Sequence, residues 1–400
     1  MAVAKKMEST WRWYGPKDPI TLADIKQTNA TGIVTALHEV PNGEVWTVEA
    51  IMERKKMVED AGMVWSVIES IPIHEDIKRR VGDYEKYFEN YRQSLRNAAA
   101  CGIDTVCYNF MPIIDWTRTS LRWPLGDGAL ALAFDYELMV AFDAYILARP
   151  GAENDYSEAD LAAAKARFER LTDEEKEEVT RVVLAGLPGS EESYTTAEFQ
   201  ETLDAYAGFD GDKLRSHLLM FLDEIMPTAE EVGIRMAIHP DDPPRGLFGL
   251  PRVVSKKEDI QAMIDSQPSV ANGITLCVGS YGSVPTNDVL EIAEAFKDRV
   301  YFFHARNVKL VGDDRNSFVE VEPFEGDADM FSIIKVLLEE QKRREEAGDT
   351  RLIPMRPDHG MQMLYDLDRV TNPGYSLLGR MKNLANLIGA EEAIIRGGLV

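Results

Sequence analysis

The sequence predicts an α/β protein: a (β/α)8 TIM-type barrel with one helical insertion between its fourth and fifth strands. Two observations lead to this fold. Seven short strand-like runs alternate with amphipathic helical stretches along the chain, and such alternation favours a parallel barrel. The runs are continuously apolar and rich in Val and Ile, which is typical of strands buried on both faces. An open doubly wound sheet is the alternative architecture.

Each of the seven runs follows a Gly or a short polar break. The segment TWRWYG at 10–15 supplies the eighth strand, because it precedes a helix that opens at Thr21 with Asp24 as its capping partner. The seven other runs lie at 31–38, 62–69, 102–110, 233–242, 273–279, 299–307 and 351–359.

One interval, from residue 115 to about residue 215, interrupts this repeat. It holds no good strand pattern, and its acidic run at 173–178 is typical of a solvated helix face. We therefore expect residues 1–400 to form a single barrel domain that carries 115–215 as a helical insertion. Three residue pairs in this interval have the spacing of helix-capping boxes: Ser157 with Asp160, Thr172 with Glu175, and Thr195 with Glu198.

The overall charge argues against a nucleic-acid partner. The chain has 44 basic and 68 acidic residues and a net charge of -24, whereas affinity for phosphate backbones depends on Lys and Arg. An anionic small molecule remains possible as a ligand. Its site would need local positive charge from a metal ion or from a few convergent arginines.

Targeting and cysteine content favour the cytoplasm. The first 15 residues have two lysines but no apolar run behind them, and no stretch approaches 18 apolar residues. We therefore expect neither a leader nor a membrane span. The cysteines are Cys101, Cys107 and Cys277, and an odd, sparse set does not indicate a disulfide framework.

Function in a barrel lies at the carboxyl ends of its strands, and four of the six histidines fall there. His239, Cys277, His304 and Asp358 lie on successive predicted strands, at intervals of 38, 27 and 54 residues. These intervals are too long for a local zinc knuckle but fit one ligand per strand. Imidazole, thiolate and carboxylate groups are ligands of first-row metals, so the four residues together could hold one ion.

Other candidates have a structural alternative. Cys101 and Cys107 are expected in the core, and His217 lies in a helical pattern, RSHLLMFLDEIM. His74, in a loop, could face the site or solvent. Tyr375 follows a Pro-Gly turn and would ordinarily be a packing residue, although a loop leaving the eighth strand can fold back over the barrel mouth.

The chain resembles the mannonate dehydratase family, in the xylose-isomerase-like group of barrels. The similarity runs from about Thr10 to about residue 390, with several long motifs in the family's order and spacing. These motifs are WRWYGPKDPI (11–20), VTALHEVPNGEVW (34–46), VWSVIESIPIHEDIK (64–78), DTVCYNFMPIIDWTRT (104–119), HPDDPP (239–244), GSYG (279–282) and IPMRPDHG (353–360).

The resemblance implies dehydration of D-mannonate to 2-keto-3-deoxy-D-gluconate in hexuronate catabolism, with Mn²⁺ or Fe²⁺ as cofactor. It implies His359 and Tyr375 as the acid/base pair, with their individual roles open. A homo-oligomer, dimeric or larger, is expected. The implied metal ligands are His239, Cys277, His304 and Asp358, and the expected substrate ligands at strand ends are Arg306, Arg356, Asn109 and Glu69.

Other functions share parts of this pattern. A metal-dependent sugar or sugar-acid isomerase or epimerase on the same barrel would move protons without loss of water. A sugar-acid-binding protein without activity would tolerate loss of the ligand set, which is intact here. A metal-dependent nuclease on a related barrel is disfavoured by the net charge.

Overall fold

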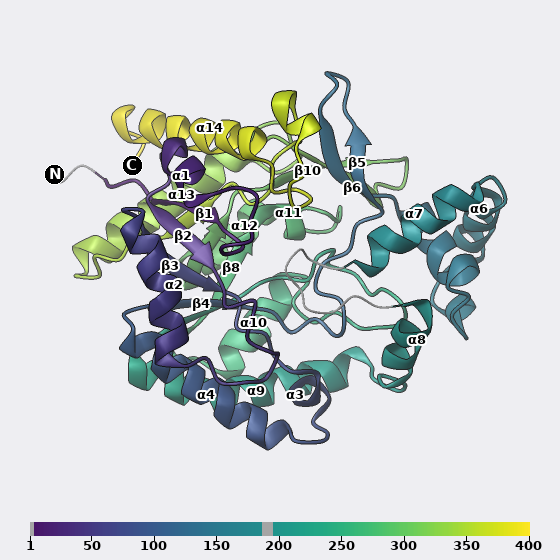
Figure 1. Ribbon diagram of the computed structural model, residues 1–400, viewed down its shortest axis with the longest axis horizontal. Helices are drawn as coiled ribbons and strands as arrows, with labels where there is room; N and C mark the ends of the chain where they lie inside the picture. Colours follow the sequence, from purple (N-terminus) through teal and green to yellow (C-terminus); the bar gives the residue numbers. More distant parts are fainter. Residues whose placement is uncertain (1–3, 186–194) are drawn as a thin grey trace.

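Eight parallel strands close into a barrel in the order β1-β12-β9-β8-β7-β4-β3-β2, which confirms the predicted (β/α)8 fold (Figure 1). The computed structural model describes residues 4–185 and 195–400. All eight predicted strands form. They are β1 Glu8–Arg12, β2 Gly32–Thr35, β3 Val64–Glu69, β4 Thr105–Tyr108, β7 Arg235–Ile238, β8 Asn272–Cys277, β9 Val300–His304 and β12 Pro354–Arg356.

Helices surround the barrel and bury one apolar stripe each against the strands. In α9, which covers Gly211–Val232, buried residues recur at the helical spacing of Leu214, Leu218, Phe221 and Ile225. Replacing a side chain such as Phe221 with Ala would cost about 3–5 kcal/mol of stability. The other helices that follow barrel strands are α1 Leu22–Ile25, α2 Val48–Asp60, α4 Tyr84–Ala100, α10 Lys257–Ser266, α12 Val289–Phe296, α13 Met330–Glu346 and α14 Leu377–Arg396.

The described N-terminal segment lies beside the C-terminal helix, at the left of Figure 1. The backbone N–H of Met7 donates to the Glu391 side chain of α14 over 2.8 Å, and Lys6 donates to Glu392 over 2.9 Å. Thr21 and Asp24 form the predicted capping box of α1. The contacts of Lys6 and Met7 hold the segment before β1 against α14, the last helix of the barrel.

A second sheet was not predicted. Four antiparallel strands form it in the order β10-β11-β6-β5, and two of them lie between residues 115 and 215, so the expectation that this interval holds no strand was wrong. The error has a physical cause, since β5 is largely exposed and lacks the continuous apolar run of a barrel strand. The four strands, which we call the auxiliary sheet, are β5 Ser120–Pro124, β6 Leu130–Phe134, β10 Asn307–Val311 and β11 Ser317–Val321.

The insertion lies between β4 and β7, the fourth and fifth barrel strands, and contains helices as predicted. The three predicted capping boxes, at Ser157, Thr172 and Thr195, are all present. The single-domain organisation with insertion limits of 115 and 215 stays a prediction. The insertion helices are α5 Tyr136–Ala141, the π-helix η2 Phe142–Ile146, η3 Ala152–Asn154, α6 Glu158–Phe168, α7 Asp173–Leu184 and α8 Thr196–Asp204.

The remaining short helices of the described chain lie outside the insertion. They are η1 Lys26–Thr28, α3 Glu75–Arg79, α11 Val278–Tyr281, η4 Lys297–Arg299 and η5 Leu364–Asp368.

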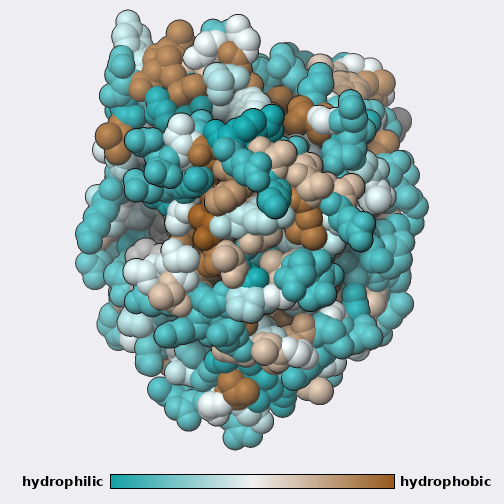
Figure 2. Space-filling model, turned by 90° about the vertical axis from the view of Figure 1, so that its right-hand side faces the viewer, coloured by the Kyte–Doolittle hydropathy of each residue, from teal (hydrophilic) through white to brown (hydrophobic). Residues whose placement is uncertain are grey.

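Hydrophilic residues cover most of the face shown in Figure 2, with hydrophobic residues gathered near its middle. This face corresponds to the right-hand side of Figure 1, where α6, α7 and α8 lie. Within the described part of the chain, no helix is both long and apolar enough to cross a membrane.

Candidate active site

The register of the barrel strands sets the level of the site. Cys277, the last residue of β8, is paired with His304, the last residue of β9. His304 is in turn paired with Arg356, the last residue of β12. Because paired residues on parallel strands lie at the same height, these three strand-end side chains gather at one end of the barrel.

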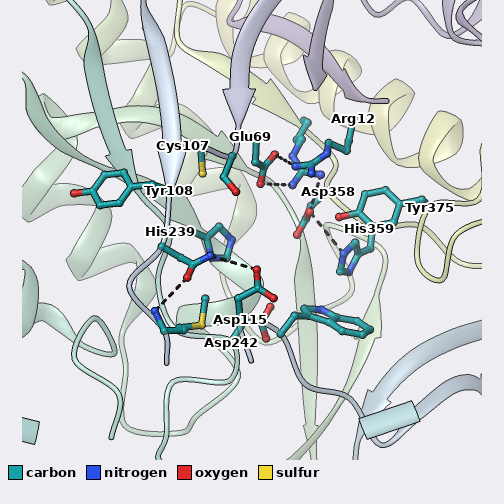
Figure 3. Close-up of a pocket in the computed structure, with 15 residues that line it drawn as sticks. Arg12, Glu69, Cys107, Tyr108, Asp115, His239, Asp242, Asp358, His359 and Tyr375 are labelled. Carbon is teal, nitrogen blue, oxygen red and sulfur yellow. Dashed lines mark hydrogen bonds and ion pairs between the residues drawn. The ribbon is translucent and has the colours of Figure 1, made fainter. Parts of the chain in front are cut away.

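A pocket opens at this end of the barrel (Figure 3). Seven of the ten predicted site residues line it, so residues far apart in sequence are brought together as the barrel predicted. Two predicted residues, Cys277 and His304, are fully buried and are not among the lining residues, but they adjoin His239, which lines the pocket. The lining residues are Arg12, Glu69, Ser70, Cys107, Tyr108, Asn109, Met111, Asp115, Trp116, His239, Asp242, Arg356, Asp358, His359 and Tyr375.

His239, Cys277 and His304 form a compact cluster next to the pocket. One ligand atom from each lies within 4.8 Å of the others. The Asp358 carboxylate adjoins the cluster, with Oδ2 at 3.9 Å from the Cys277 Sγ atom and at 4.0 Å from the His304 Nδ1 atom. These four residues are the ones that the strand-end pattern predicted as a ligand set.

Electrostatics favour the thiolate form of Cys277. Burial raises the pKa of this thiol, but the charge of Arg306 and hydrogen bonding to His239 outweigh burial and lower the pKa well below its usual range. Ser280 Oγ also donates to the sulfur over 3.0 Å. Thiolate is the form in which cysteine binds metal ions.

The two histidines also present nitrogen atoms suited to an ion. His239 donates its Nδ1 hydrogen to the carbonyl of Pro240 over 2.7 Å, so Nε2 is the nitrogen left for an ion. Burial lowers the pKa of this imidazole, but the hydrogen bond and charge of Cys277 outweigh burial and raise the pKa to about 9, so an ion would displace a proton there. His304 is fully buried, and its Nε2 atom accepts a hydrogen bond from the Arg356 Nε atom over 3.0 Å. Its Nδ1 atom has no hydrogen-bond partner, and an ion bound there would displace the hydrogen that a neutral ring carries at Nδ1. A buried polar atom without a partner is unfavourable unless a ligand satisfies it, so this donor set fits a divalent first-row ion.

Two arginines bring positive charge to the pocket. Arg356 contacts Asp358 at 2.8 Å and Glu69 at 3.0 Å, and Arg12 contacts Glu69 at 2.9 Å. Burial raises the pKa of Glu69, but Arg356 and Arg12 outweigh it and hold that pKa at about 2. The carboxylate of Glu69 therefore stays ionised between the two guanidinium groups.

Tyr375 and His359 lie on the same side of the pocket (Figure 3). The loop after β12 folds back, with the Gly360 N–H donating to the Gly374 carbonyl over 2.9 Å, and this brings Tyr375 into the pocket lining. Burial raises the pKa of Tyr375, while Arg356 and Arg12 oppose the increase. The phenol is therefore neutral near pH 7 and can donate a proton.

Arg306 does not line the pocket. It is 2% exposed, and its guanidinium group contacts Asp242 at 2.6 Å and Glu320 at 2.7 Å. The Arg306 side chain passes close to Gly279, where a Cβ atom would lie 2.6 Å from the Arg306 Nε atom. Direct contact between Arg306 and a substrate stays a prediction.

Sequence reasoning missed several residues of the site. Arg12 could have been found from the strand-end rule, since it is the last residue of β1. Asp115 and Trp116 lie in the loop after β4, within the motif DTVCYNFMPIIDWTRT, but not at a strand end, so the strand-end rule did not select them. Glu320 lies on β11, a strand that was not predicted, so no sequence signal placed it near the pocket.

The remaining candidates lie elsewhere. His217 contacts the Lys78 carbonyl through Nδ1, and His74 caps helix α3 and stacks on a tyrosine ring, so neither lines the pocket. Cys101 is buried in the core as predicted. Cys107 is also fully buried, but it reaches the pocket wall.

A barrel whose strand ends surround a buried pocket with paired arginines, carboxylates, histidines and a tyrosine defines an enzyme of the (β/α)8-barrel class. Residues 7–398 match the sequence profile of D-mannonate dehydratase. The chain belongs to this family of dehydratases.

Curated relatives and a solved structure agree with this assignment. The chain is 55% identical to a mannonate dehydratase of Marinomonas sp. (strain MWYL1), over 96% of this chain and 98% of the relative. It is 54% identical to a mannonate dehydratase of Chromohalobacter salexigens, over 97% of this chain and 99% of the relative. The crystal structure of mannonate dehydratase from Streptococcus suis serotype 2 superposes with a TM-score of 0.77, at 37% identity, covering 98% of this chain and 95% of that one.

Proposed function

We propose that this chain is a hydro-lyase that converts D-mannonate to 2-keto-3-deoxy-D-gluconate and water with the help of a divalent ion, within hexuronate catabolism. The single observation that carries the proposal is the adjacency of three groups in one pocket. A His/Cys/His cluster with Asp358 adjoins the pocket through His239 and Asp358, Arg12 and Arg356 supply positive charge, and His359 and Tyr375 supply two groups able to exchange protons.

The reaction explains why these groups are needed together. The base removes the proton from C2, and the electron pair left behind forms a C2=C3 double bond as the 3-hydroxyl departs. Protonation of that hydroxyl by the acid releases water, and the resulting enol becomes the 2-keto product. Removal of the C2 proton adds negative charge beside a carboxylate that is already charged, so the site must stabilise two charges on neighbouring atoms.

Arg12 and Arg356 are suited to bind the substrate carboxylate. Both line the pocket and are less than 5% exposed, and a guanidinium group can hold a carboxylate with two parallel hydrogen bonds. Glu69 and Asn109 also line the pocket. The carboxylate of Glu69 can accept hydrogen bonds from sugar hydroxyls, and the amide of Asn109 can both accept and donate them.

His359 and Tyr375 are the proposed proton-transfer groups. A positioned acid or base contributes about 10² to 10⁴ in rate. The imidazole of His359 has a ring nitrogen that can take or return a proton, while the neutral phenol of Tyr375 can only give a proton until another group has removed it. Which group acts at C2 is tested by the exchange experiment described in the Discussion.

The residues that would hold the ion are His239, Cys277, His304 and Asp358, and the proposed ion is Mn²⁺ or Fe²⁺. When bound, such an ion acts as a Lewis acid that withdraws charge from oxygen atoms of the substrate. The thiolate ligand favours the softer Fe²⁺ of the two. An ion held by His304 would give a partner to its buried Nδ1 atom, which has no hydrogen-bond partner.

Metal reconstitution with D-mannonate tests the proposal. The metal-free protein is loaded with Mn²⁺ or Fe²⁺, and the 2-keto-3-deoxy acid is detected with thiobarbiturate after periodate oxidation. Product formation with at least one ion is expected. Absence of product with every divalent ion would overturn the proposal.

A sugar-acid isomerase or epimerase is the second candidate, favoured by the same barrel and proton-transfer pair. It would consume the sugar acid without yielding a 2-keto-3-deoxy acid, so the same assay separates the two activities.

The proposal also includes a cytoplasmic location and a homo-oligomer of two or more chains. Size-exclusion chromatography with light scattering measures the oligomeric state.

A further inference from the structure

Glu320 is a buried carboxylate that reaches the site from outside the barrel. It lies on β11 of the auxiliary sheet, opposite Val308 of β10, and is 3% exposed. Its Oε2 atom is 2.8 Å and its Oε1 atom 3.0 Å from the Nδ1 atom of His359. The auxiliary sheet therefore contacts one of the proposed proton-transfer groups directly.

Two arginines hold this carboxylate in place. The Arg118 Nη2 atom and the Arg306 Nη1 atom each donate to Glu320 Oε1 over 2.7 Å. The same two arginines also bind Asp242, at 2.8 Å and 2.6 Å. Two positive and two negative charges thus balance one another in a buried network, which gives Glu320 little freedom to move.

The charge state of Glu320 fixes the direction of its bond to His359. Burial raises the pKa of Glu320, but a protonated His359 and the guanidinium groups of Arg306 and Arg118 outweigh it and hold that pKa at about 2. When His359 is neutral, the two arginines still donate to the carboxylate over 2.7 Å and favour its ionised form. An ionised carboxylate can only accept hydrogen bonds. Nδ1 of His359 must therefore carry the hydrogen.

This tautomer leaves the other ring nitrogen for chemistry. With Nδ1 protonated, Nε2 of a neutral His359 holds a lone pair. Nε2 lies 3.8 Å from the Asp358 Oδ1 atom, and both residues line the pocket. A fixed ring and a fixed tautomer are what a proton-transfer histidine needs, because a rotated ring or the other tautomer would offer the wrong atom to the substrate.

We propose that Glu320 is a positioning residue, supplied by the auxiliary sheet, which holds His359 in the tautomer with hydrogen at Nδ1 and with Nε2 available to the pocket. The role in turnover rests on the proposed function, whereas the tautomer itself does not. A purely structural role is the competing explanation, in which Glu320 only neutralises Arg118 and Arg306.

The tautomer can be read directly. Nitrogen-15 NMR of the metal-free protein, labelled at its histidines, distinguishes a protonated from an unprotonated ring nitrogen, and the spectrum of His359→Asn identifies the His359 signals. We expect a protonated Nδ1 in the wild-type protein. A hydrogen at Nε2 alone would overturn the proposal, whether or not any Glu320 variant folds.

A double-mutant cycle tests the role in turnover. Glu320→Gln, whose amide group can donate to Nδ1, should lower kcat by about tenfold or more with KM within about twofold and unchanged metal content. In a His359→Asn background the same change should alter kcat by less than about twofold, because a residue that acts through His359 has nothing left to position. Equal effects in both backgrounds, or an unchanged kcat, would overturn the proposal.

The matched control is Asp143→Asn. Asp143 is also a fully buried carboxylate paired with an arginine, Arg149 at 2.8 Å, but it lies in the insertion away from the pocket. Its substitution should leave kcat unchanged even if it lowers stability. If the wild-type chain does not dehydrate D-mannonate, the proposed function fails by itself, and the NMR measurement still decides the tautomer.

Discussion

His359 and Tyr375 meet edge to face, with ring centroids 5.0 Å apart and ring planes at 77°. Gly374 permits this contact, because it has a φ of +78° and a Cβ atom there would lie 3.1 Å from the His359 Cγ atom. The turn before Tyr375 therefore sets the distance between the two proposed proton-transfer groups, and any side chain at 374 would disturb it.

Tyr375→Phe should lower kcat by about 10² or more while bound metal stays unchanged, because it deletes only the hydroxyl group. Steady-state kinetics and metal analysis of the purified variant measure both quantities. The matched control is Tyr91→Phe, since Tyr91 is buried in the core and its hydroxyl has no hydrogen-bond partner. Near-normal kcat in Tyr375→Phe would return this residue to a packing role.

His359→Asn should also lower kcat by about 10² or more, and comparison with Tyr375→Phe assigns the roles. Exchange of the C2 hydrogen of mannonate with solvent deuterium, followed by NMR, reports removal of that proton. The variant that lacks the base should lose exchange, while the variant that lacks only the acid can retain it. If both variants retained exchange, neither residue would be the base.

Cys277→Ala should lower bound metal and turnover together, because the variant removes a thiolate from a cluster whose atoms lie within 4.8 Å of one another. Metal analysis by mass spectrometry and kcat measure the two effects. Cys101→Ala is the control, since Cys101 is a buried thiol outside the cluster. Full occupancy and activity in Cys277→Ala would contradict the four-ligand assignment.

Chelation should abolish activity and leave the fold largely intact. The core between the barrel strands and the helices consists of apolar side chains that do not include the four proposed ligands, so the fold does not depend on an ion as a zinc finger does. Circular dichroism before and after EDTA measures this. A loss of helical signal together with the activity would make the ion structural.

Glu391 makes stability depend on pH. Burial raises the pKa of this carboxyl from 4.5 to about 7, and its Oε2 atom has no hydrogen-bond partner. Between these values the folded chain binds more protons than the unfolded chain, so this group's contribution to stability falls as pH rises through about 4.5 to 7. Above pH 7 the contribution is fully lost.

Glu391→Gln should therefore raise the free energy of unfolding at pH 8 by up to about 3 kcal/mol, and Tm with it. At pH 5 the substitution should change Tm little. Thermal unfolding at both pH values measures the difference. Glu392→Gln, at the neighbouring, partly exposed position that pairs with Lys6, should show no such gain. An equal effect of Glu391→Gln at both pH values would contradict a raised pKa.

The sequence alone determined the barrel and much of its site. Apolar runs such as those around Val34 and Phe302 identify strands buried on both faces, and the alternation with helices sets their order. Once the strands close into a barrel, the last residue of each must lie near the others, so Cys277 and His304 could be placed together although 27 residues separate them.

Only the tertiary structure decided the rest. Each strand of the auxiliary sheet has five residues, but β5 is largely exposed, and β10 and β11 are interrupted by Lys309 and Glu320. Of the four, β6 (LALAF) has the continuous apolar run by which barrel strands are recognised. Nothing in the run SFVEV of β11 indicates that Glu320 is buried or that it faces His359. A carboxylate tolerates burial only where partners neutralise it, and here those partners are Arg118 and Arg306, which lie 202 residues and 14 residues away in the chain.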